Sequence, residues 1–304
     1  MSFADGLKTI VVATDLAGRS EAALEYARKL ATAYGARIVL AHGIDPMEYA
    51  AVDALPGRVL KTLPDEARAV LDRLSADLLR EGIHSHSEVR QGAVAQMLLD
   101  VARQYQAGLI VVGTEGKQGA GPVIVGAVAE ELVRLSECPV LAVAADWNAG
   151  PFRPTPGGPV LLAMERNEAA SAAAATARSL ARIFERPLLV LHARTPEEAV
   201  ANPNPCAATL EALGLEGLGI QAGGEIEVRC IAKDGNPAEA IAEGIAENHP
   251  CILVAGVKRA SCTPGPHGTA FALLALSRVP VLCVPPESAP AKHKPEACDC
   301  AQTR

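Results

Sequence analysis

The sequence of this 304-residue chain contains the same pattern twice. The segment Val11–His42 aligns with Leu161–His192 without a gap, and Gly92–Gly113 aligns equally well with Gly235–Gly256. The short segment CPVLAV, at residues 138–143, is matched by VPVLCV near the end of the chain. Such a repeat corresponds to one complete structural unit, so the sequence predicts two copies of one architecture.

Proline and glycine mark the boundary between the two copies. The segment DWNAGPFRPTPGG cannot continue a helix or a central strand, because its prolines lack a backbone donor. The last segment is rich in Pro, Lys and Cys, and we expect it to be disordered. The predicted organisation is a first domain at 1–146, a linker at 147–158, a second domain at 159–286 and a flexible tail at 287–304.

Within each copy, short apolar runs rich in β-branched residues alternate with helical patterns. In the first copy we expect strands at 8–14, 37–43, 84–90, 108–113 and 139–145, and helices at 19–34, 58–81, 93–106 and 126–136. Gly35 and Gly82 stand where glycines end helices, and Asn236-Pro237 has the form of a helix start. Unbroken runs such as LIVVG are typical of parallel strands covered on both faces. The predicted fold is α/β, with two tandem doubly wound domains, each a five-stranded, mainly parallel sheet with helices on both faces.

Composition excludes several classes of function. The formal charge of −7 argues against a nucleic-acid partner, because binding to phosphates needs a basic face. The first residues turn acidic before a signal peptide could form, and no apolar run is long enough for a membrane span, so we expect a cytoplasmic protein. The eight cysteines are therefore expected to be thiols rather than a disulfide framework, with Cys251 and Cys283 buried in strands.

The glycine-rich segment after Val112 has the spacing of a phosphate-binding loop. Ligands of open α/β sheets bind beyond the carboxyl ends of strands, where Ala13-Thr14-Asp15 and Val112-Gly113 are expected to converge. Gly113 and Gly116 would let backbone N–H groups approach phosphate oxygens, and Gly126 would open a helix whose N-terminus favours an anion. Lys117 could add a positive charge, and Asp15 could accept a hydrogen bond from a base or a sugar.

These residues resemble the universal stress proteins, a family of adenine nucleotide alpha-hydrolase-like fold. The resemblance covers nearly the whole chain as two tandem copies. ATP-binding members carry G-x2-G-x9-G followed by Ser or Thr, and this chain matches through Gly113, Gly116 and Gly126. Asp15 matches the aspartate that ends the first strand of the family, and His42 matches its histidine in the second strand.

The resemblance implies that the first domain binds ATP, with magnesium as a possible companion. The glycines would hold the phosphates, and the strand ends would border adenine and ribose. The implied binding residues are Ala13, Thr14, Asp15, Gly43, Val112, Gly113, Gly116, Lys117, Gly126 and Ala127. Two of them depart from the family pattern: Ala127 lacks the hydroxyl, and Gly43 lacks the apolar side chain that lines the adenine pocket. The first departure would weaken binding by about 1 kcal/mol, and the second would loosen the pocket or make room for another ligand.

The second copy departs further from the nucleotide-binding pattern. Arg259 replaces a motif glycine, the following loop is stiffened by prolines, and Glu165 beside Met164 replaces the aspartate. We therefore expect a degenerate site there.

Three functions remain open on the sequence. The first is a nucleotide-responsive regulator of the stress response, acting through an unidentified protein partner and without catalysis. The second is an interaction scaffold that needs no nucleotide. The third, an enzyme on a similar fold, is disfavoured because neither a His-x-Gly-His nor a Ser-Gly-Gly type loop occurs near the first strand. A flavin-binding electron carrier is disfavoured as well.

The remaining polar clusters are interpreted as structural. His42 and His192 occupy equivalent places, which favours a hydrogen bond within the fold, and His84 and His86 are expected on the exposed face of an edge strand. Cys262 lies in a loop and could be a reactive thiol. Cys298 and Cys300 lie in the tail near His293 and could bind a soft metal. The sequence favours neither role. The resemblance also implies that the two domains pack as a pseudo-dimer, which their apolar last strands support, and further homodimerisation stays open.

Overall fold

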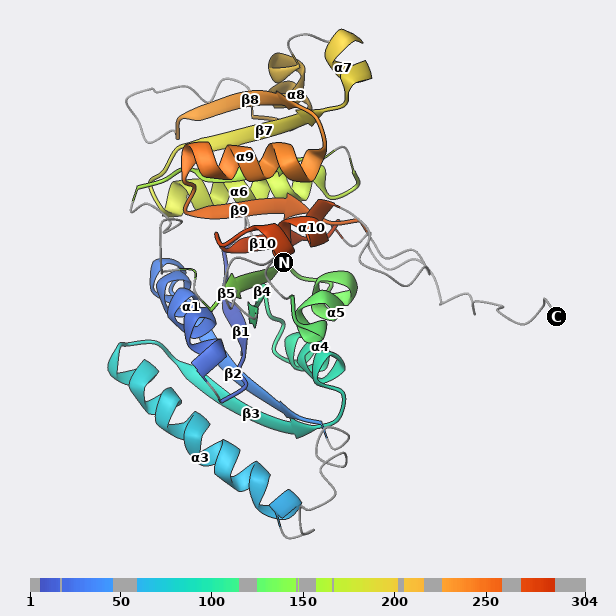
Figure 1. Cartoon of the computed structure of the whole chain (residues 1–304). Coiled ribbons are helices and arrows are strands. Elements are labelled where there is room, and N and C mark those ends of the chain that lie inside the picture. Colours follow the sequence, from blue (N-terminus) through green and yellow to red (C-terminus); the bar gives the residue numbers. More distant parts are fainter. Residues whose placement is uncertain are drawn as a thin grey trace, which may run out of the picture.

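The computed structural model describes residues 6–16, 18–45, 59–114, 125–145, 147, 157–165, 167–201, 205–215, 226–258 and 269–287. Two halves of similar construction follow one another along the chain (Figure 1). The first half contains β1 (Thr9–Ala13), η2 (Gly18–Ser20), α1 (Glu21–Tyr34), β2 (Arg37–Ile44), α3 (Val59–Arg80), β3 (Ser85–Gln91), α4 (Val94–Gln104), β4 (Leu109–Thr114), α5 (Ala127–Leu135) and β5 (Val140–Ala144).

The second half repeats the order of the strands, with two differences among the described residues: no counterpart of η2 precedes its first helix, and two short helices follow the second strand. It contains β6 (Val160–Met164), α6 (Ala170–Ile183), β7 (Leu188–Arg194), α7 (Pro196–Ala201), α8 (Cys206–Ala212), β8 (Val228–Asp234), α9 (Pro237–Asn248), β9 (Ile252–Gly256), α10 (Thr269–Leu276) and β10 (Val281–Val284).

The strands of both halves form one continuous sheet of ten, in the order β3-β2-β1-β4-β5-β10-β9-β6-β7-β8. Among the described strands, neighbours within each half are parallel, and the central pair, β5 and β10, is antiparallel. In that pair Leu141 lies opposite Leu282, which are equivalent residues of the two copies, so the junction has a local twofold relation. Both the doubly wound α/β fold and the packing of the halves through their last strands are confirmed.

Local sequence signals account for where the helices begin and end. Gly35 ends α1 in the left-handed conformation, with φ of 64°, and its N–H donates to the carbonyl of Ala31. Asn236 caps α9, since its side chain accepts from the N–H of Ala238, and Pro237 occupies the first helical position. The glycine and the cap predicted from the sequence thus perform these roles.

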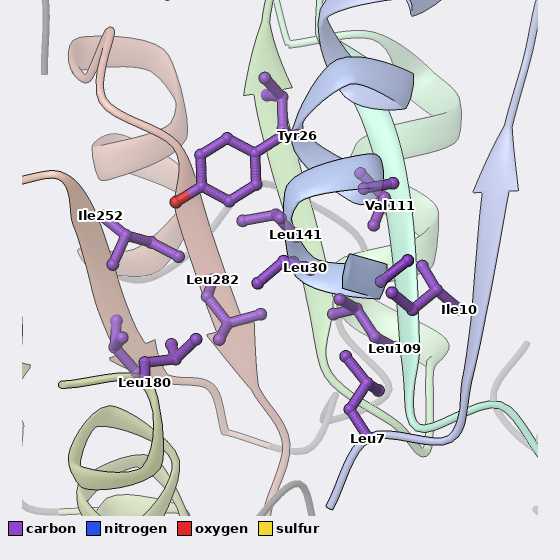
Figure 2. Packing of buried hydrophobic residues seen from close by; sticks show 14 of the residues in the cluster. Leu7, Ile10, Tyr26, Leu30, Leu109, Val111, Leu141, Leu180, Ile252 and Leu282 are labelled. Atoms are coloured by element: carbon purple, nitrogen blue, oxygen red, sulfur yellow. The ribbon is translucent and has the colours of Figure 1, made fainter. Parts of the chain in front are cut away.

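Two hydrophobic clusters cover the two faces of the sheet, and each of them spans both halves. Successive strand residues alternate between the faces, as the period of a strand requires: Ile10 and Val12 belong to one cluster and Val11 to the other. Figure 2 shows the first cluster, in which Leu141 and Leu282 meet where the halves join. Burial of both faces explains why the central strands are almost purely apolar.

The two halves differ in the helices beside their outer strands. In the first half, α3 has 22 residues and contributes Leu71 and Leu78 to the first cluster. In the second half the same face carries α8, which has only seven residues.

A disulfide joins α8 to β8 through Cys206 and Cys230, whose Cα atoms lie 5.5 Å apart. The expectation that the cysteines are thiols is therefore wrong for this pair. Residues 24 positions apart were brought within bridging distance by the fold, which cysteine spacing does not reveal. Cys251 and Cys283 are free thiols, as expected, although Cys251 is only partly buried.

Candidate functional site

A cavity of about 460 Å³ opens at the carboxyl edge of the first-half sheet. It lies between β1 and β4, where the strand order reverses, which is the usual ligand position in doubly wound folds. Its wall is formed by Ala13, Thr14, Asp15, Ser20, Ala41, His42, Gly43, Val94, Leu98, Val112, Gly113, Thr114, Gly126, Ala127, Val128 and Ala129.

The cavity gathers every predicted binding residue that the structure describes. These are Ala13, Thr14, Asp15, Gly43, Val112, Gly113, Gly126 and Ala127. Gly116 and Lys117 lie outside the described residues. The ends of three strands and the start of one helix therefore meet around one space. The first of these strands and the helix are more than a hundred residues apart along the chain.

Asp15 is oriented by a compact hydrogen-bond network. The Ser20 hydroxyl donates to Asp15 Oδ1 at 2.8 Å and lies 3.0 Å from the hydroxyl of Thr14. The N–H of Leu16 donates to Thr14 Oγ1, and Leu16 itself takes a positive φ of 58°. Because L-residues rarely adopt this conformation, the turn after β1 is held in place by these bonds.

His42 ties the end of β2 to the end of β1. Its Nδ1 lies 2.8 Å from the carbonyl oxygen of Thr14. A carbonyl can only accept, so Nδ1 carries the proton and Nε2 is the remaining ring nitrogen. The expected hydrogen bond within the fold is therefore present, and the ring also borders the cavity.

The space next to Gly43 is occupied by side chains of α4. A Cβ atom added at Gly43 would come within 2.8 Å of the Met97 methyl and within 3.0 Å of a Val94 methyl. The expectation of a loosened or enlarged pocket is therefore wrong at this position. Apolar packing that a side chain at position 43 would supply comes instead from the neighbouring helix.

The N-terminus of α5 forms part of the cavity wall. Gly126 precedes the helix in an extended conformation, and its carbonyl accepts from the N–H of Glu130. Among the described residues no side chain caps this end. The first N–H groups of a helix lack intrahelical acceptors and carry a partial positive charge, so this wall is suited to an anion.

A smaller cavity of about 220 Å³ lies at the equivalent place in the second half. Its wall includes Met164, Glu165, His192, Gly256 and Thr269, the counterparts of first-half residues. Lys258 lies 3.1 Å from the Glu165 carboxylate, in an ion pair at partly exposed positions. A cavity is therefore present in the second half as well, with a smaller volume, and the degenerate nucleotide site there stays a prediction.

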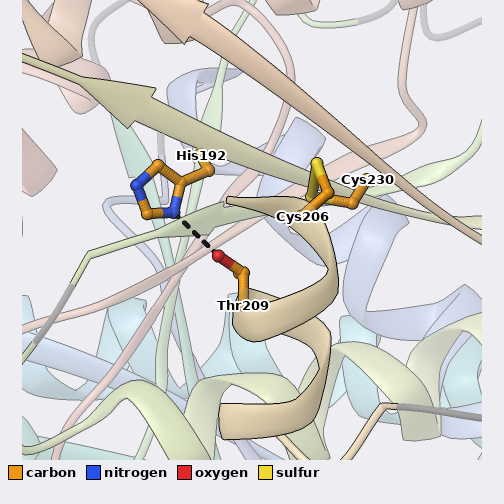
Figure 3. Close-up of a disulfide and its surroundings, with 4 residues drawn as sticks. All are labelled: His192, Cys206, Thr209 and Cys230. Carbon is orange, nitrogen blue, oxygen red and sulfur yellow. Dashed lines mark hydrogen bonds between the residues drawn. A yellow bond between two sulfur atoms is a disulfide. The ribbon is translucent and has the colours of Figure 1, made fainter. Parts of the chain in front are cut away.

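The equivalent histidines differ in their partners. His192 is almost fully buried, and its Nδ1 lies 3.1 Å from the Thr209 hydroxyl of α8 (Figure 3). His42 is bonded to the end of the neighbouring strand, and His192 has a residue of α8 among its partners.

Some lining residues were not predicted from the sequence. Ser20 carries a functional signal only as a hydroxyl residue at a helix start, while Val94 and Leu98 have the periodicity of ordinary core residues. Arg259, Cys262, His293, Cys298 and Cys300, for which other roles were weighed, lie outside the described residues.

The expected edge strand is β3, which contains His86, while His84 lies just before it. Within it, the ring of His86 packs 5.3 Å from that of Tyr105, and its Nε2 lies 3.6 Å from Glu88.

In the described part of the chain no three potential ligands are grouped to hold a metal ion. The described helices also include none with the length and apolar character of a membrane span.

Comparison with known proteins agrees with this geometry. The model of the universal stress protein family matches residues 6–144 and again residues 158–285. A universal stress protein of Methanocaldococcus jannaschii is 29% identical over 138 residues, which are 45% of this chain and 81% of the relative. A universal stress protein A homolog of Coxiella burnetii is 30% identical over 140 residues, which are 45% of this chain and 95% of the relative.

The whole two-part arrangement also has a counterpart among solved structures. A universal stress protein of Archaeoglobus fulgidus superposes with a TM-score of 0.71 at 18% identity, over 91% of this chain and 98% of that one. This likeness concerns the fold, whereas the family model matches the sequence of each half. The chain therefore belongs to the universal stress protein family, with two copies of the family domain in tandem.

Proposed function

We propose that the first-half cavity binds an adenine nucleotide such as ATP, and that the protein acts as a nucleotide-responsive regulator of the stress response rather than as a catalyst. The observation that carries the proposal is the cavity at the β1–β4 reversal. Its volume of about 460 Å³ lies within the range of small-molecule sites, roughly 300–1,000 Å³.

The chemistry of the wall fits the parts of a nucleotide. Val94 and Leu98 offer an apolar surface for the base, and the Asp15 carboxylate can accept hydrogen bonds from ribose hydroxyls or an amino group. Gly113 and the N-terminus of α5 can receive phosphate oxygens through backbone N–H groups. Ala127 removes one donor hydroxyl but leaves its own N–H in place.

Magnesium would enter with the phosphates. With no three-ligand group among the described residues, the ion would be held mainly by phosphate oxygens and water, as is usual for Mg²⁺.

We expect binding rather than turnover because Asp15 and His42, two titratable side chains of the cavity, form hydrogen bonds within the protein. Asp15 accepts from Ser20, and the Nδ1–H of His42 donates to the carbonyl of Thr14. Both groups thus support strand ends. A ligand that bridges β1, β4 and α5 would favour one arrangement of these elements, by as much as its affinity for that arrangement exceeds its affinity for others.

The test uses Gly126, where an added Cβ would meet no atom within 4 Å and φ is −66°. Gly126→Glu adds a negative charge where the phosphates are proposed to lie, and Gly126→Gln is a control of the same size without the charge. We expect calorimetry to show that Gly126→Glu weakens ATP binding about tenfold more than Gly126→Gln, which is about 1.4 kcal/mol. Adenosine, which has no phosphates, should bind both variants alike.

Equal ATP affinities for the two variants would remove the helix N-terminus from the site. Absence of ATP binding by the wild type, together with purified protein that releases no nucleotide on denaturation, would favour the scaffold function instead. Ala127, which lacks the hydroxyl of ATP-binding relatives, is the observation that keeps this alternative open.

A further inference from the structure

The helix α8 is too short to be stable without help. Its seven residues form about two turns, and isolated helices below about 12–15 residues are marginal in water. The corresponding position in the first half carries the 22-residue α3, which contributes Leu71 and Leu78 to the first hydrophobic cluster. Attachments to the rest of the second half must therefore hold α8 in place.

The structure shows three such attachments, of which Figure 3 shows the disulfide and the bond from Thr209 to His192. The Cys206–Cys230 disulfide bonds the first residue of α8 to β8, an outer strand of the sheet. The hydroxyl of Thr209, which is 3% exposed, is hydrogen-bonded to His192. Leu215, just beyond the helix, is 2% exposed in the first hydrophobic cluster.

His192, the residue to which Thr209 of α8 is bonded, also forms part of the wall of the second-half cavity. His192 lines this cavity, as do Thr195 and Glu198, which lie on the segment between β7 and Cys206. Thr195 and Glu198 form a reciprocal capping box at the start of α7, with bonds of 3.3 and 3.0 Å. The end of β7 and the start of α7 therefore contribute to the wall of this cavity.

The disulfide is placed to exchange with external thiols. Cys206 and Cys230 are both partly exposed, so a small thiol or a redox protein can approach the bond. The free thiols Cys251 and Cys283 are less suited to such exchange than the disulfide cysteines. Burial raises the pKa of Cys251 to about 11 and that of Cys283 to about 12. These two groups stay protonated at neutral pH and are poor nucleophiles.

We propose that the Cys206–Cys230 disulfide is a redox switch that controls the second-half cavity through Thr209 and His192. A dithiol donor, of the small-molecule or thioredoxin class, supplies two electrons and two protons. The S–S bond breaks, two S–H groups form, and the donor leaves as its own disulfide. Reduction frees the start of α8, so the Thr209–His192 hydrogen bond opens more often and the cavity wall loses its fixed shape. Oxidation by a disulfide of the same class reverses each step.

The experiment compares the oxidised full-length protein with the protein reduced by dithiothreitol. Alkylation and peptide mass spectrometry establish which cysteines are bonded in each sample. Nitrogen-15 NMR of the histidine rings then reports on His192, with assignments from His192→Gln and His42→Gln variants. We expect the His192 ring signals to shift on reduction while those of His42 stay unchanged. Hydrogen exchange of the α8 amides should accelerate at least tenfold, with α4 unaffected.

A Thr209→Val variant separates the switch from a mere crosslink. Valine has the shape of threonine but cannot bond to His192, so the disulfide should form while the His192 signals no longer respond to reduction. The proposal is overturned if Cys206 and Cys230 are unbonded in the oxidised protein. It is also overturned if reduction leaves His192 and α8 unchanged, or if Thr209→Val responds like the wild type. An equal change at His42 would indicate general loosening and contradict the proposal as well.

Discussion

Replacing Gly43 by valine should destabilise the first half, although the change would usually stabilise a strand. Valine is favoured over glycine in strands by up to about 1 kcal/mol. At Gly43, however, the first added carbon already comes within 2.8 Å of the Met97 methyl and 3.0 Å of a Val94 methyl. Overpacking of this kind costs about 1–3 kcal/mol, so we expect a net loss of stability.

The free energy of unfolding can be followed in the relevant half of the molecule. Trp147, the single tryptophan, is buried and packs edge-on against Tyr26 of α1, with ring centroids 5.3 Å apart. Its fluorescence therefore reports unfolding of the first half in urea. With a urea dependence of about 2 kcal/mol/M, a loss of 1–2 kcal/mol lowers the midpoint by about 0.5–1 M.

A second substitution tests whether Met97 is the cause. Met97→Ala alone should cost about 2–5 kcal/mol, because Met97 is 6% exposed in the second hydrophobic cluster. In the double variant the valine at position 43 can occupy the vacated space, so its effect should change sign and the two costs should not add. Simple additivity, or a Gly43→Val protein more stable than the wild type, would refute the packing described around Gly43.

Further predictions concern a helix cap and a carboxylate. Asn236→Ala should cost about 1 kcal/mol, because the side chain caps α9, and Ala93→Asn at the equivalent start of α4 should gain a similar amount in thermal unfolding. A failure of both variants to change stability would show that these caps are not needed. Burial acts to raise the pKa of Glu88, but hydrogen bonds from Tyr105 and Arg90 outweigh it and lower that pKa. The ionised carboxylate therefore stabilises the fold above the unfolded pKa of about 4.3, and this contribution is lost as the pH falls through the lower folded pKa. The Glu88→Gln variant lacks the carboxylate, so it should lose less stability than the wild type between about pH 5 and pH 3. Urea midpoints at each pH measure this difference. Equal losses would mean that Glu88 is not held in this way.

The sequence was sufficient for the fold because its signals are local or repeated. The expected helix at 93–106 is observed at Val94–Gln104, and the expected strand at 37–43 at Arg37–Ile44. Each depends on hydrophobic periodicity and on turn residues that act within a few positions. The junction of the halves was implied by the family resemblance, which the apolar last strands supported.

The site could be predicted only as far as backbone positions define it. Asp15 and Gly113 were expected at the cavity because strand ends of a parallel sheet meet at one edge. The bond from Ser20 to Asp15 and the packing of Met97 against Gly43 depend on side-chain contacts that no spacing reveals. The Cys206–Cys230 disulfide was missed for the same reason, since its cysteines lie on different elements.

The antiparallel pair of β5 and β10 has a consequence for how this protein can evolve. When two identical chains meet at such a junction, every substitution appears on both sides, and a change that suits one site is imposed on the other. Here Leu141 and Leu282 are encoded separately, so each side can mutate alone while the shared junction is preserved. The disulfide-bonded helix α8 and the smaller cavity, both in the second half, are differences of the kind that this independence permits.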